Sequence, residues 1–376
     1  MRKGLLFVFV VLSVVVHAQS VSDYLREADG DLNNNDYADA IIGYNKVISI
    51  DPKSIHAYIN RAVARGLMND YDGAFADYEQ AKDIDRKVYQ IYNSRGLLRA
   101  RMKNYHNAIA DYDTALMFHP ADPEVLVNRA IAKRCIENYK GAISDCDQAV
   151  AADPSYAYGY YTRADIRVMY IHPRQGTAAI LDCDTVISLE GETTSNLILR
   201  GIARSVAEDY AGSIRDFDAA MDIDPSDAIT YIDRSDSRHH LRDYEGSMAD
   251  CRIAISLDPT NQMAYFNIGN DLDSLGDHKA AIEYYIQSIH LARDSNYVAE
   301  GYCARGESQA ALKNYQAALL DFDRAIHADP ECAEAYYARA VTNIKLKQNR
   351  GACADLKKAL EYDKPEAAEL LQKYCK

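Results

Sequence analysis

The sequence predicts an all-α solenoid of about ten antiparallel helix pairs, closed by a C-terminal capping helix. The first reason is a period: six prolines are separated by 34 residues or by multiples of 34, with three extra residues in two of the gaps. These prolines are Pro52, Pro120, Pro154, Pro225, Pro259 and Pro330. The second reason is that tyrosines, small residues and charged residues recur at fixed positions of this period. A constant period of this length is typical of a solenoid whose unit is one helix pair.

Residues 1–18 predict a secretory signal peptide ahead of the repeats. Arg2 and Lys3 precede thirteen uncharged, mostly apolar residues, and the small residue Ala18 follows. The apolar run is shorter than the roughly 20 residues of a membrane-spanning helix, so we expect cleavage after Ala18. The alternative is an uncleaved anchor. We therefore expect an exported protein, periplasmic or secreted, without stable membrane insertion after cleavage.

Ten repeats are expected over residues 21–365, with a capping helix at 366–376. Their first helices should begin near residues 21, 55, 89, 123, 157, 194, 228, 262, 299 and 333. The extra residues fall near "YIHPRQG" inside the fifth repeat and near "DSNYVA" before the ninth. Counting positions from each beginning, tyrosine occupies position 4 in eight repeats and position 17 in seven. Small residues recur at positions 8, 20 and 27, where they let two helices approach closely.

This pattern resembles the tetratricopeptide repeat family over about residues 21–365. The resemblance implies a right-handed superhelix whose first helices line a concave groove, and a role in protein binding without catalysis. It also implies that positions 2, 5, 9 and 12 of the first helices face that groove. One feature departs from the family pattern: position 7, commonly leucine, is arginine in most repeats.

The arginine at position 7 predicts a structural pair with the aspartate at position 23. Eight repeats have both residues, and the two repeats that lack the arginine, with Glu27 and Ile268, also lack the aspartate. Paired loss within one repeat indicates a charge-assisted hydrogen bond between its two helices. The predicted pairs are Arg61–Asp77, Arg95–Asp111, Arg129–Asp145, Arg163–Asp182, Arg200–Asp216, Arg234–Asp250, Arg305–Asp321 and Arg339–Asp355. Position 25 carries acids in some repeats and bases in others, which predicts a solvated face.

The positions of the eight cysteines favour reduced, buried side chains over disulfides. Cys146, Cys183 and Cys251 share position 24, which other repeats fill with aromatic rings such as Tyr112. Equivalent positions of adjacent repeats lie roughly 10 Å apart, too far for a bridge. We therefore expect most cysteines to be reduced. Cys353 with Cys375, near the cap, is the least implausible bridge, but we do not predict it.

Charge and motifs exclude several functions. The chain has 42 lysines and arginines against 56 acids, a formal net charge of -14, which disfavours nucleic acid as a partner. The sequence contains no H-E-x-x-H, phosphate loop, G-x-S-x-G or dinucleotide fingerprint, and no C-x-x-C pair. We therefore expect no enzymatic activity, no cofactor and no metal.

By the resemblance, the groove is apolar and aromatic in its middle and acidic in patches, with Asp165, Asp236, Glu300 and Glu307 among its acids. The predicted partner-binding residues are Ile59, Val63, Asn93, Leu97, Val127, Ile131, Arg134, Tyr158, Tyr161, Ile198, Ile202, Ile232, Phe266, Asn270 and Tyr337. Such a groove suits an extended peptide or a partner helix with apolar anchors. Some of these residues could instead pack against neighbouring repeats.

Three hypotheses follow for function. The first is a non-enzymatic scaffold or adaptor of the cell envelope that holds a protein or peptide partner of unknown identity. The second is a structural self-assembly element, in which the groove of one copy receives part of another. The third is a small-ligand binder or enzyme, which no motif supports and which would need a deep polar pocket.

Overall fold

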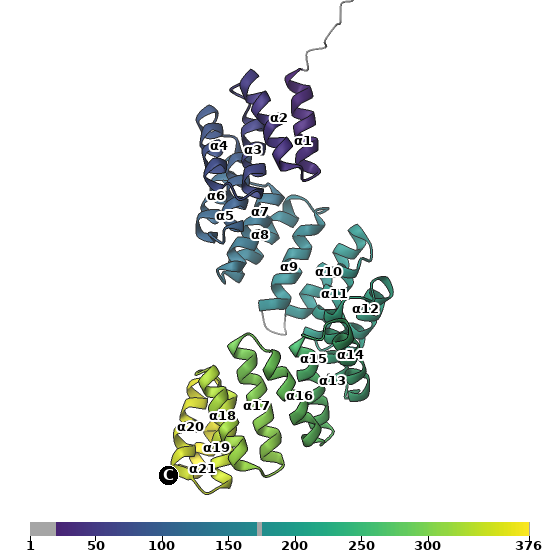
Figure 1. Cartoon of the computed structure of the whole chain (residues 1–376), viewed down its shortest axis with the longest axis vertical. Coiled ribbons are helices and arrows are strands. Elements are labelled where there is room, and N and C mark those ends of the chain that lie inside the picture. The colour runs from purple at the N-terminus through teal and green to yellow at the C-terminus, as the bar shows by residue number, and fades with distance from the viewer. Residues whose placement is uncertain (1–19, 171–174, 376) are drawn as a thin grey trace, which may run out of the picture. The chain divides into compact units, whose positions relative to one another are not determined.

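The computed structural model describes residues 20–170 and 175–375, which contain 21 α-helices and no strand (Figure 1). The predicted signal peptide and part of the "YIHPRQG" segment lie outside the described residues. The prediction of an all-α fold with ten helix pairs and a capping helix is confirmed. The helices are α1 (Val21–Asn33), α2 (Tyr37–Ile50), α3 (Ile55–Leu67), α4 (Tyr71–Ile84), α5 (Tyr89–Arg101), α6 (Tyr105–Phe118), α7 (Pro123–Cys135), α8 (Tyr139–Ala152), α9 (Ala157–Tyr170), α10 (Gly176–Glu190), α11 (Thr194–Val206), α12 (Tyr210–Ile223), α13 (Ala228–His240), α14 (Tyr244–Leu257), α15 (Gln262–Ser274), α16 (His278–Leu291), α17 (Ser295–Ala311), α18 (Tyr315–Ala328), α19 (Ala333–Lys345), α20 (Asn349–Glu361) and α21 (Ala367–Tyr374).

The chain divides between Thr162 and Arg163 into two compact units. In each unit the odd-numbered helix of a pair is the first helix of a repeat and packs against the second helix that follows it. First helices of neighbouring repeats also contact one another, as α3 contacts α5 and α13 contacts α15, whereas second helices contact the next first helix. We call the surface that the first helices form the inner face of each unit.

One local turn ends nine of the first helices in the described residues, and in several repeats the residue after it caps the second helix. In the repeat that begins at Ile55, Asn69 adopts a left-handed conformation with φ of 64°, and the Asp70 N–H then donates to the Arg65 carbonyl. The Asp70 carboxylate next accepts a hydrogen bond of 3.0 Å from the Gly73 N–H and so caps α4. Eight repeats place a left-handed residue other than glycine at this position, and the repeat at Gln262 uses Gly276. Turn and cap therefore come from neighbouring residues of each repeat.

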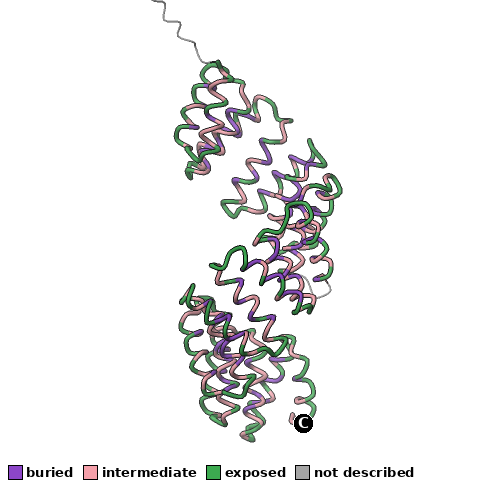
Figure 2. The backbone as a smooth tube through the Cα atoms, turned by 90° about the vertical axis from the view of Figure 1, so that its right-hand side faces the viewer, coloured by how far each residue is buried: buried purple, intermediate pink, exposed green. Residues whose placement is uncertain are grey.

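The core lies between helices, and buried residues follow the helix faces turned toward one another (Figure 2). Position 24 holds its largest members: the rings of Tyr112, Phe217 and Phe322 are at most 1% exposed. A Cβ added to Gly201 would lie 2.7 Å from the Phe217 ring, so the glycine lets this ring lie flat on the first helix. The three cysteines predicted at position 24 are buried, as expected, and Cys183 and Cys251 are free thiols.

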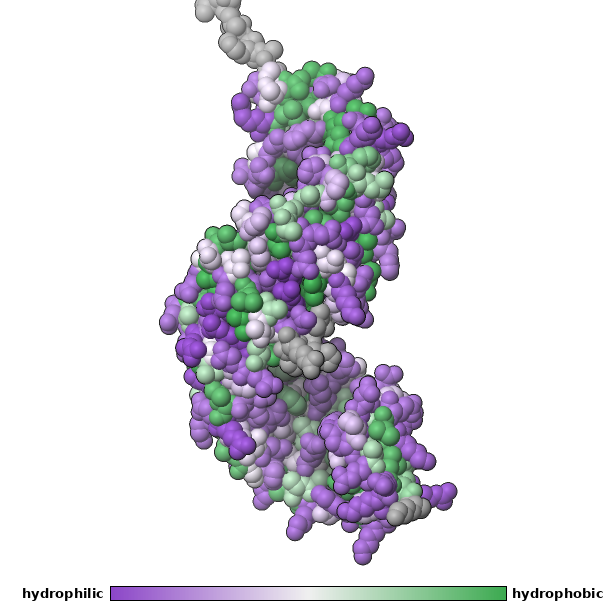
Figure 3. Space-filling model, turned by 180° about the vertical axis from the view of Figure 1, so that it is seen from behind, coloured by the Kyte–Doolittle hydropathy of each residue, from purple (hydrophilic) through white to green (hydrophobic). Residues whose placement is uncertain are grey.

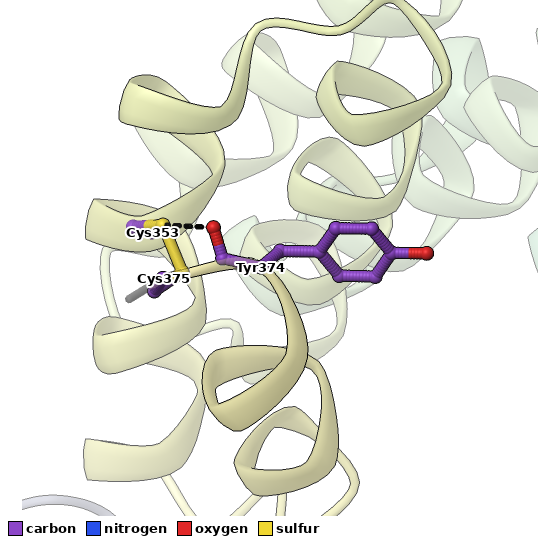
Figure 4. The surroundings of a disulfide bond; sticks show 3 residues. All are labelled: Cys353, Tyr374 and Cys375. Atoms are coloured by element: carbon purple, nitrogen blue, oxygen red, sulfur yellow. Dashed lines mark hydrogen bonds between the residues drawn. A yellow bond between two sulfur atoms is a disulfide. The ribbon is translucent and has the colours of Figure 1, made fainter.

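The C-terminal end corrects the cysteine prediction. Cys353 in α20 forms a disulfide with Cys375, just after α21, across a Cα–Cα distance of 5.7 Å (Figure 4). The Cys353 sulfur also lies 3.8 Å from the Tyr374 carbonyl oxygen, while the Tyr374 ring points away from the bridge. The spacing argument could not find this bridge because Cys375 lies in the cap and not in a repeat. The disulfide ties the cap to the last helix pair.

The extra residues before the ninth repeat lengthen a helix. α17 begins at Ser295, four residues before the expected Ala299, and spans 17 residues where most first helices span 13. Asp294 caps it, because its carboxylate accepts a hydrogen bond of 2.8 Å from the Asn296 N–H. No helix of the described residues is long and apolar enough to cross a membrane.

Candidate functional site

The structure brings every predicted arginine–aspartate pair into contact. In the repeat at Tyr89, Arg95 donates to Asp111 through Nε at 3.1 Å and through Nη2 at 2.7 Å. The eight aspartates are only 1% to 7% exposed, so these carboxylates lie inside the repeat. The first acid of each "DYD"-like motif therefore joins the two helices of its own repeat.

A second cation, at position 11, was missed by the sequence analysis. Arg99 places Nη1 2.7 Å from Asp111, and Lys133 places Nζ 2.7 Å from Asp145. Six of the eight aspartates have such a second partner in the described residues: Asp77, Asp111, Asp145, Asp182, Asp216 and Asp250. The basic residue recurs at position 11 in those same six repeats, so the signal was present in the sequence.

Position 25 is more than the solvated face that we expected. Arg95 Nη1 lies 2.6 Å from Glu79 Oε1 of the preceding repeat, and Arg129 Nη1 lies 2.6 Å from Asp113. Arg200, Arg234 and Arg339 make the corresponding contact with the preceding repeat. The position-25 acids are about half exposed, but they link successive repeats through the same guanidinium that binds position 23. One arginine thus holds two repeats together.

The two repeats that lack the arginine–aspartate pair use tyrosine instead: Tyr44 donates to Asp29 at 2.7 Å, and Tyr285 donates to Asn270 at 2.8 Å. In the second of these repeats, Asp271 is fully buried and its Oδ1 lies 2.6 Å from His239 Nδ1.

The predicted groove residues differ in their accessibility. Leu97 and Tyr158 are 44% and 48% exposed on the inner face of the first unit, and the rings of Tyr158 and Tyr161 stack. Ile131, Arg134, Ile198, Phe266 and Asn270 are partly buried, and Phe266 packs beside the Tyr285 ring. Ile59, Asn93 and Ile232 are each 8% exposed.

The prediction that Val127 lines the groove is wrong. It is fully buried within the core of the first unit, so it cannot touch a partner without a rearrangement of the core. Asn93 is also engaged internally, because its Nδ2 donates to Glu124 at 3.2 Å and its Oδ1 accepts from Asn128 at 3.1 Å. For Val127 and Asn93, the alternative expectation therefore holds: these residues pack against their surroundings in the protein and do not face the groove.

Three cavities recur at one place on the inner face, between the first helices of successive repeats and above the position-24 ring. The Tyr78 pocket, about 220 Å³, is lined by Val63, Gly66, Leu67, Tyr78, Ser94, Leu97, Leu98 and Arg101. The Phe217 pocket, about 280 Å³, is lined by Ile202, Ser205, Val206, Phe217, Ile232, Asp233, Asp236, Met263 and Asn267. The Phe322 pocket, about 270 Å³, is lined by Glu307, Ala310, Ala311, Phe322, Glu334, Tyr337, Ala338, Val341, Thr342 and Lys345.

Five predicted groove residues line these cavities: Val63, Leu97, Ile202, Ile232 and Tyr337. Position 6, which was not predicted, also contributes, through Ser94, Asp233, Asn267 and Ala338. The pockets share an aromatic floor but differ in charge. The Tyr78 pocket is apolar except for Ser94 and Arg101, whereas the other two contain carboxylates.

One carboxylate in each of the two pockets of the second unit has a raised pKa. Burial, with smaller contributions from Asp236 and Asp227, raises the pKa of Asp233 to about 7. The pKa of Glu307 is also raised because the concave surroundings reduce its hydration, although solvent still reaches its carboxylate. Glu334 beside it pairs with Lys364 at 2.7 Å. Within the described residues, neither the Asp233 nor the Glu307 side chain has a hydrogen-bond or ion-pair partner.

The chemistry of these pockets favours binding over catalysis. Each cavity is smaller than the roughly 300–1,000 Å³ typical of small-molecule sites, and suits one or two side chains. Among the described residues, no group of three or more histidine, cysteine or acidic side chains could hold a metal ion. Burial raises the pKa of the Cys183 and Cys251 thiols to about 12, so neither is an activated nucleophile.

The fold and these pockets define a helical repeat protein whose first helices carry side-chain-sized pockets. Models of the tetratricopeptide repeat match residues 55–88, 89–122 and 264–295, and a second model of this repeat matches residues 303–368. The chain therefore contains tetratricopeptide repeats, as predicted. Proteins with such repeats mediate protein–protein interactions and are generally non-enzymatic scaffolds.

Several solved structures are similar to this chain at low sequence identity. Yeast Tom70 is similar with a TM-score of 0.53 and 14% identity, over 93% of this chain and 93% of that chain. A tetratricopeptide repeat protein from Parabacteroides merdae has a TM-score of 0.49 and 15% identity, over 77% of this chain and 99% of its own. Pseudomonas aeruginosa pilF has a TM-score of 0.49 and 17% identity, over 58% of this chain and 96% of that chain. Comparison with curated proteins gives no match.

Proposed function

We propose that this protein is a non-enzymatic scaffold of the cell envelope that holds an extended peptide or a helix of a partner protein along its inner face. The observation that carries this proposal is the recurrence of side-chain-sized pockets above position-24 rings. The Phe217 and Phe322 pockets recur along the inner face of the second unit and can receive successive side chains of a single segment, which is how grooves bind peptides. The apolar and acidic character predicted for the groove agrees with the pocket linings.

We propose the inner face as the binding site because of its pockets, since apolar residues are also exposed elsewhere. Large apolar side chains are also exposed on second helices, where Met117 is 76% and Leu181 is 64% exposed. Figure 3 likewise shows hydrophobic residues scattered among hydrophilic ones on the face that it presents. Isolated exposed apolar residues are ordinary on protein surfaces, so they supply controls for the test below.

Two features support an exported location, in the periplasm or outside the cell. The sequence of residues 1–18 has the charge and length pattern of a signal peptide. The Cys353–Cys375 disulfide suits an oxidising compartment, since cytosolic thiols are kept reduced.

Affinity capture from the envelope fraction tests this function. The chain from Gln19 onward serves as bait beside a Leu97→Ser, Tyr158→Ser variant, which alters two exposed residues of the inner face. A Met117→Ser, Leu181→Ser variant makes matched changes on second helices. We expect a protein that the native chain and the second-helix variant recover and that the inner-face variant loses. Equal recovery by all three would refute the inner-face site, and recovery of the chain alone would favour self-assembly.

A further inference from the structure

The Phe217 pocket carries a more specific inference, which rests on the proposed function and names the chemistry of the partner. We propose that this pocket receives a lysine or arginine side chain of the bound segment, with the alkyl stem against Ile202 and Met263 and the charged head at Asp233 and Asp236. The partner is therefore a protein segment that carries a basic residue among apolar ones.

The walls of the pocket match the two parts of such a side chain. Ile202, Ile232 and Met263 provide apolar surface for a methylene stem, and the Phe217 ring lies fully buried behind them. The polar lining consists of two carboxylates, the Ser205 hydroxyl and the amide of Asn267, whose Nδ2 already donates to Ser235 at 3.2 Å. Its oxygen remains available to accept. A cavity of about 280 Å³ has room for one such side chain.

The pocket has negative charge without a compensating cation. No lysine or arginine lines it. The nearest arginines in the sequence are already paired, because Arg204 contacts Asp216 at 2.8 Å and Arg234 contacts Asp250 at 2.5 Å. Asp236 has only a distant contact with His240, at 3.8 Å.

Asp233 shows the clearest deficit in this pocket. Its side chain has no hydrogen-bond or ion-pair partner in the part of the chain that the structure describes, and burial raises its pKa to about 7. A bound ammonium or guanidinium group would satisfy this carboxylate and restore its charge. The same cation would also offset the repulsion between Asp233 and Asp236. An incoming basic residue would therefore supply the ion pair that Asp233 does not form within the protein.

The Phe322 pocket differs because cations already lie near its acids, and Lys364 partly counteracts the raised pKa of Glu307. Lys345 lines it, and Glu334 is paired with Lys364 at 2.7 Å. The preference for a basic side chain is therefore assigned to the Phe217 pocket alone.

A peptide selection tests the proposal without knowledge of the natural partner. Random peptides displayed on phage are selected on the chain from Gln19 onward, and enriched peptides are synthesised for affinity measurements. Binding is compared with an Asp233→Asn, Asp236→Asn variant, which keeps the shape of both side chains and removes their charge. An Asp222→Asn, Glu283→Gln variant changes two exposed carboxylates of second helices and controls for net charge.

We expect enriched peptides to contain lysine or arginine beside apolar residues. Their affinity should fall roughly tenfold or more in the Asp233, Asp236 variant and should stay within about twofold in the control. Replacement of the basic residue in the peptide by norleucine should have the same effect as the variant. Peptides that bind without a basic residue, or that bind the variant equally well, would overturn this inference and leave the scaffold function intact. Failure to enrich any peptide would count against both.

Discussion

Replacing Asp111 with alanine removes an acceptor that two arginines share. The carboxylate is 3% exposed and receives hydrogen bonds from Arg95 at 3.1 and 2.7 Å, while Arg99 lies 2.7 Å away. Without it, both guanidinium groups keep their positive charge in a partly buried site. We therefore expect the Asp111→Ala variant to be strongly destabilised.

The magnitude follows from the burial of the partners. Removing one member of a buried ion pair costs about 3–5 kcal/mol. The Arg95 and Arg99 side chains are 12% and 25% exposed, so water can partly hydrate them, and the lower end, about 3 kcal/mol, applies. Arg95→Ala should cost less, about 2 kcal/mol, because Arg99 still satisfies the carboxylate. The double variant should therefore lose at least about 1 kcal/mol less stability than the sum of the losses in the two single variants.

Urea unfolding followed by far-ultraviolet circular dichroism measures these free energies. Asp83→Ala, which removes an exposed carboxylate from the neighbouring α4, is the control and should change stability by less than about 0.5 kcal/mol. Full additivity of Arg95→Ala and Asp111→Ala would refute the pairing argument. A cost for Asp111→Ala no larger than that of the control would refute it as well.

Three further predictions follow from the structure. Gly201→Ala should cost about 1–3 kcal/mol, because the added Cβ would lie 2.7 Å from the Phe217 ring; unchanged urea unfolding would contradict this. The hydrogen bond that His239 donates to the Asp271 carboxylate raises the pKa of His239 above 6.5, so the stabilising contribution of this pair should be full below pH 6.5 and should be lost as the pH rises through the raised value. Equal pH slopes for the native chain and His239→Gln would contradict that assignment. Cys353→Ser should destabilise the C-terminal helix pair by about 3 kcal/mol and increase hydrogen exchange in α21; unaltered exchange there would show that the disulfide adds no stability.

The repeat architecture could be predicted because each repeat contains its own folding signals. The Asn69–Asp70 turn, the position-24 ring and the prolines between repeats recur with the period, so one repeat explains the others. The arginine–aspartate pair was also accessible, since Ile268 and Tyr284 show both members lost in the same repeat.

Contacts between repeats were harder to predict. Position 25 carries Asn45, Glu79 or Arg252 in different repeats, and this mixture concealed the contact with the following arginine. The role of Asp233 was missed because position 6 was not among the positions carried over from the family. Its importance depends on the Phe217 cavity and on the absence of a cation in its lining, which only side-chain coordinates can reveal.

Site-specific photo-crosslinking tests the claim of an inner binding face most directly. A photoreactive phenylalanine analogue is placed at Leu97 or Asp236 on the inner face, or at Met117 or Leu181 on second helices, and the chain is irradiated in the envelope fraction. We predict one partner protein crosslinked from the inner-face positions and absent from the second-helix positions. The same adduct from Met117 or Leu181, with none from Leu97 or Asp236, would contradict the account.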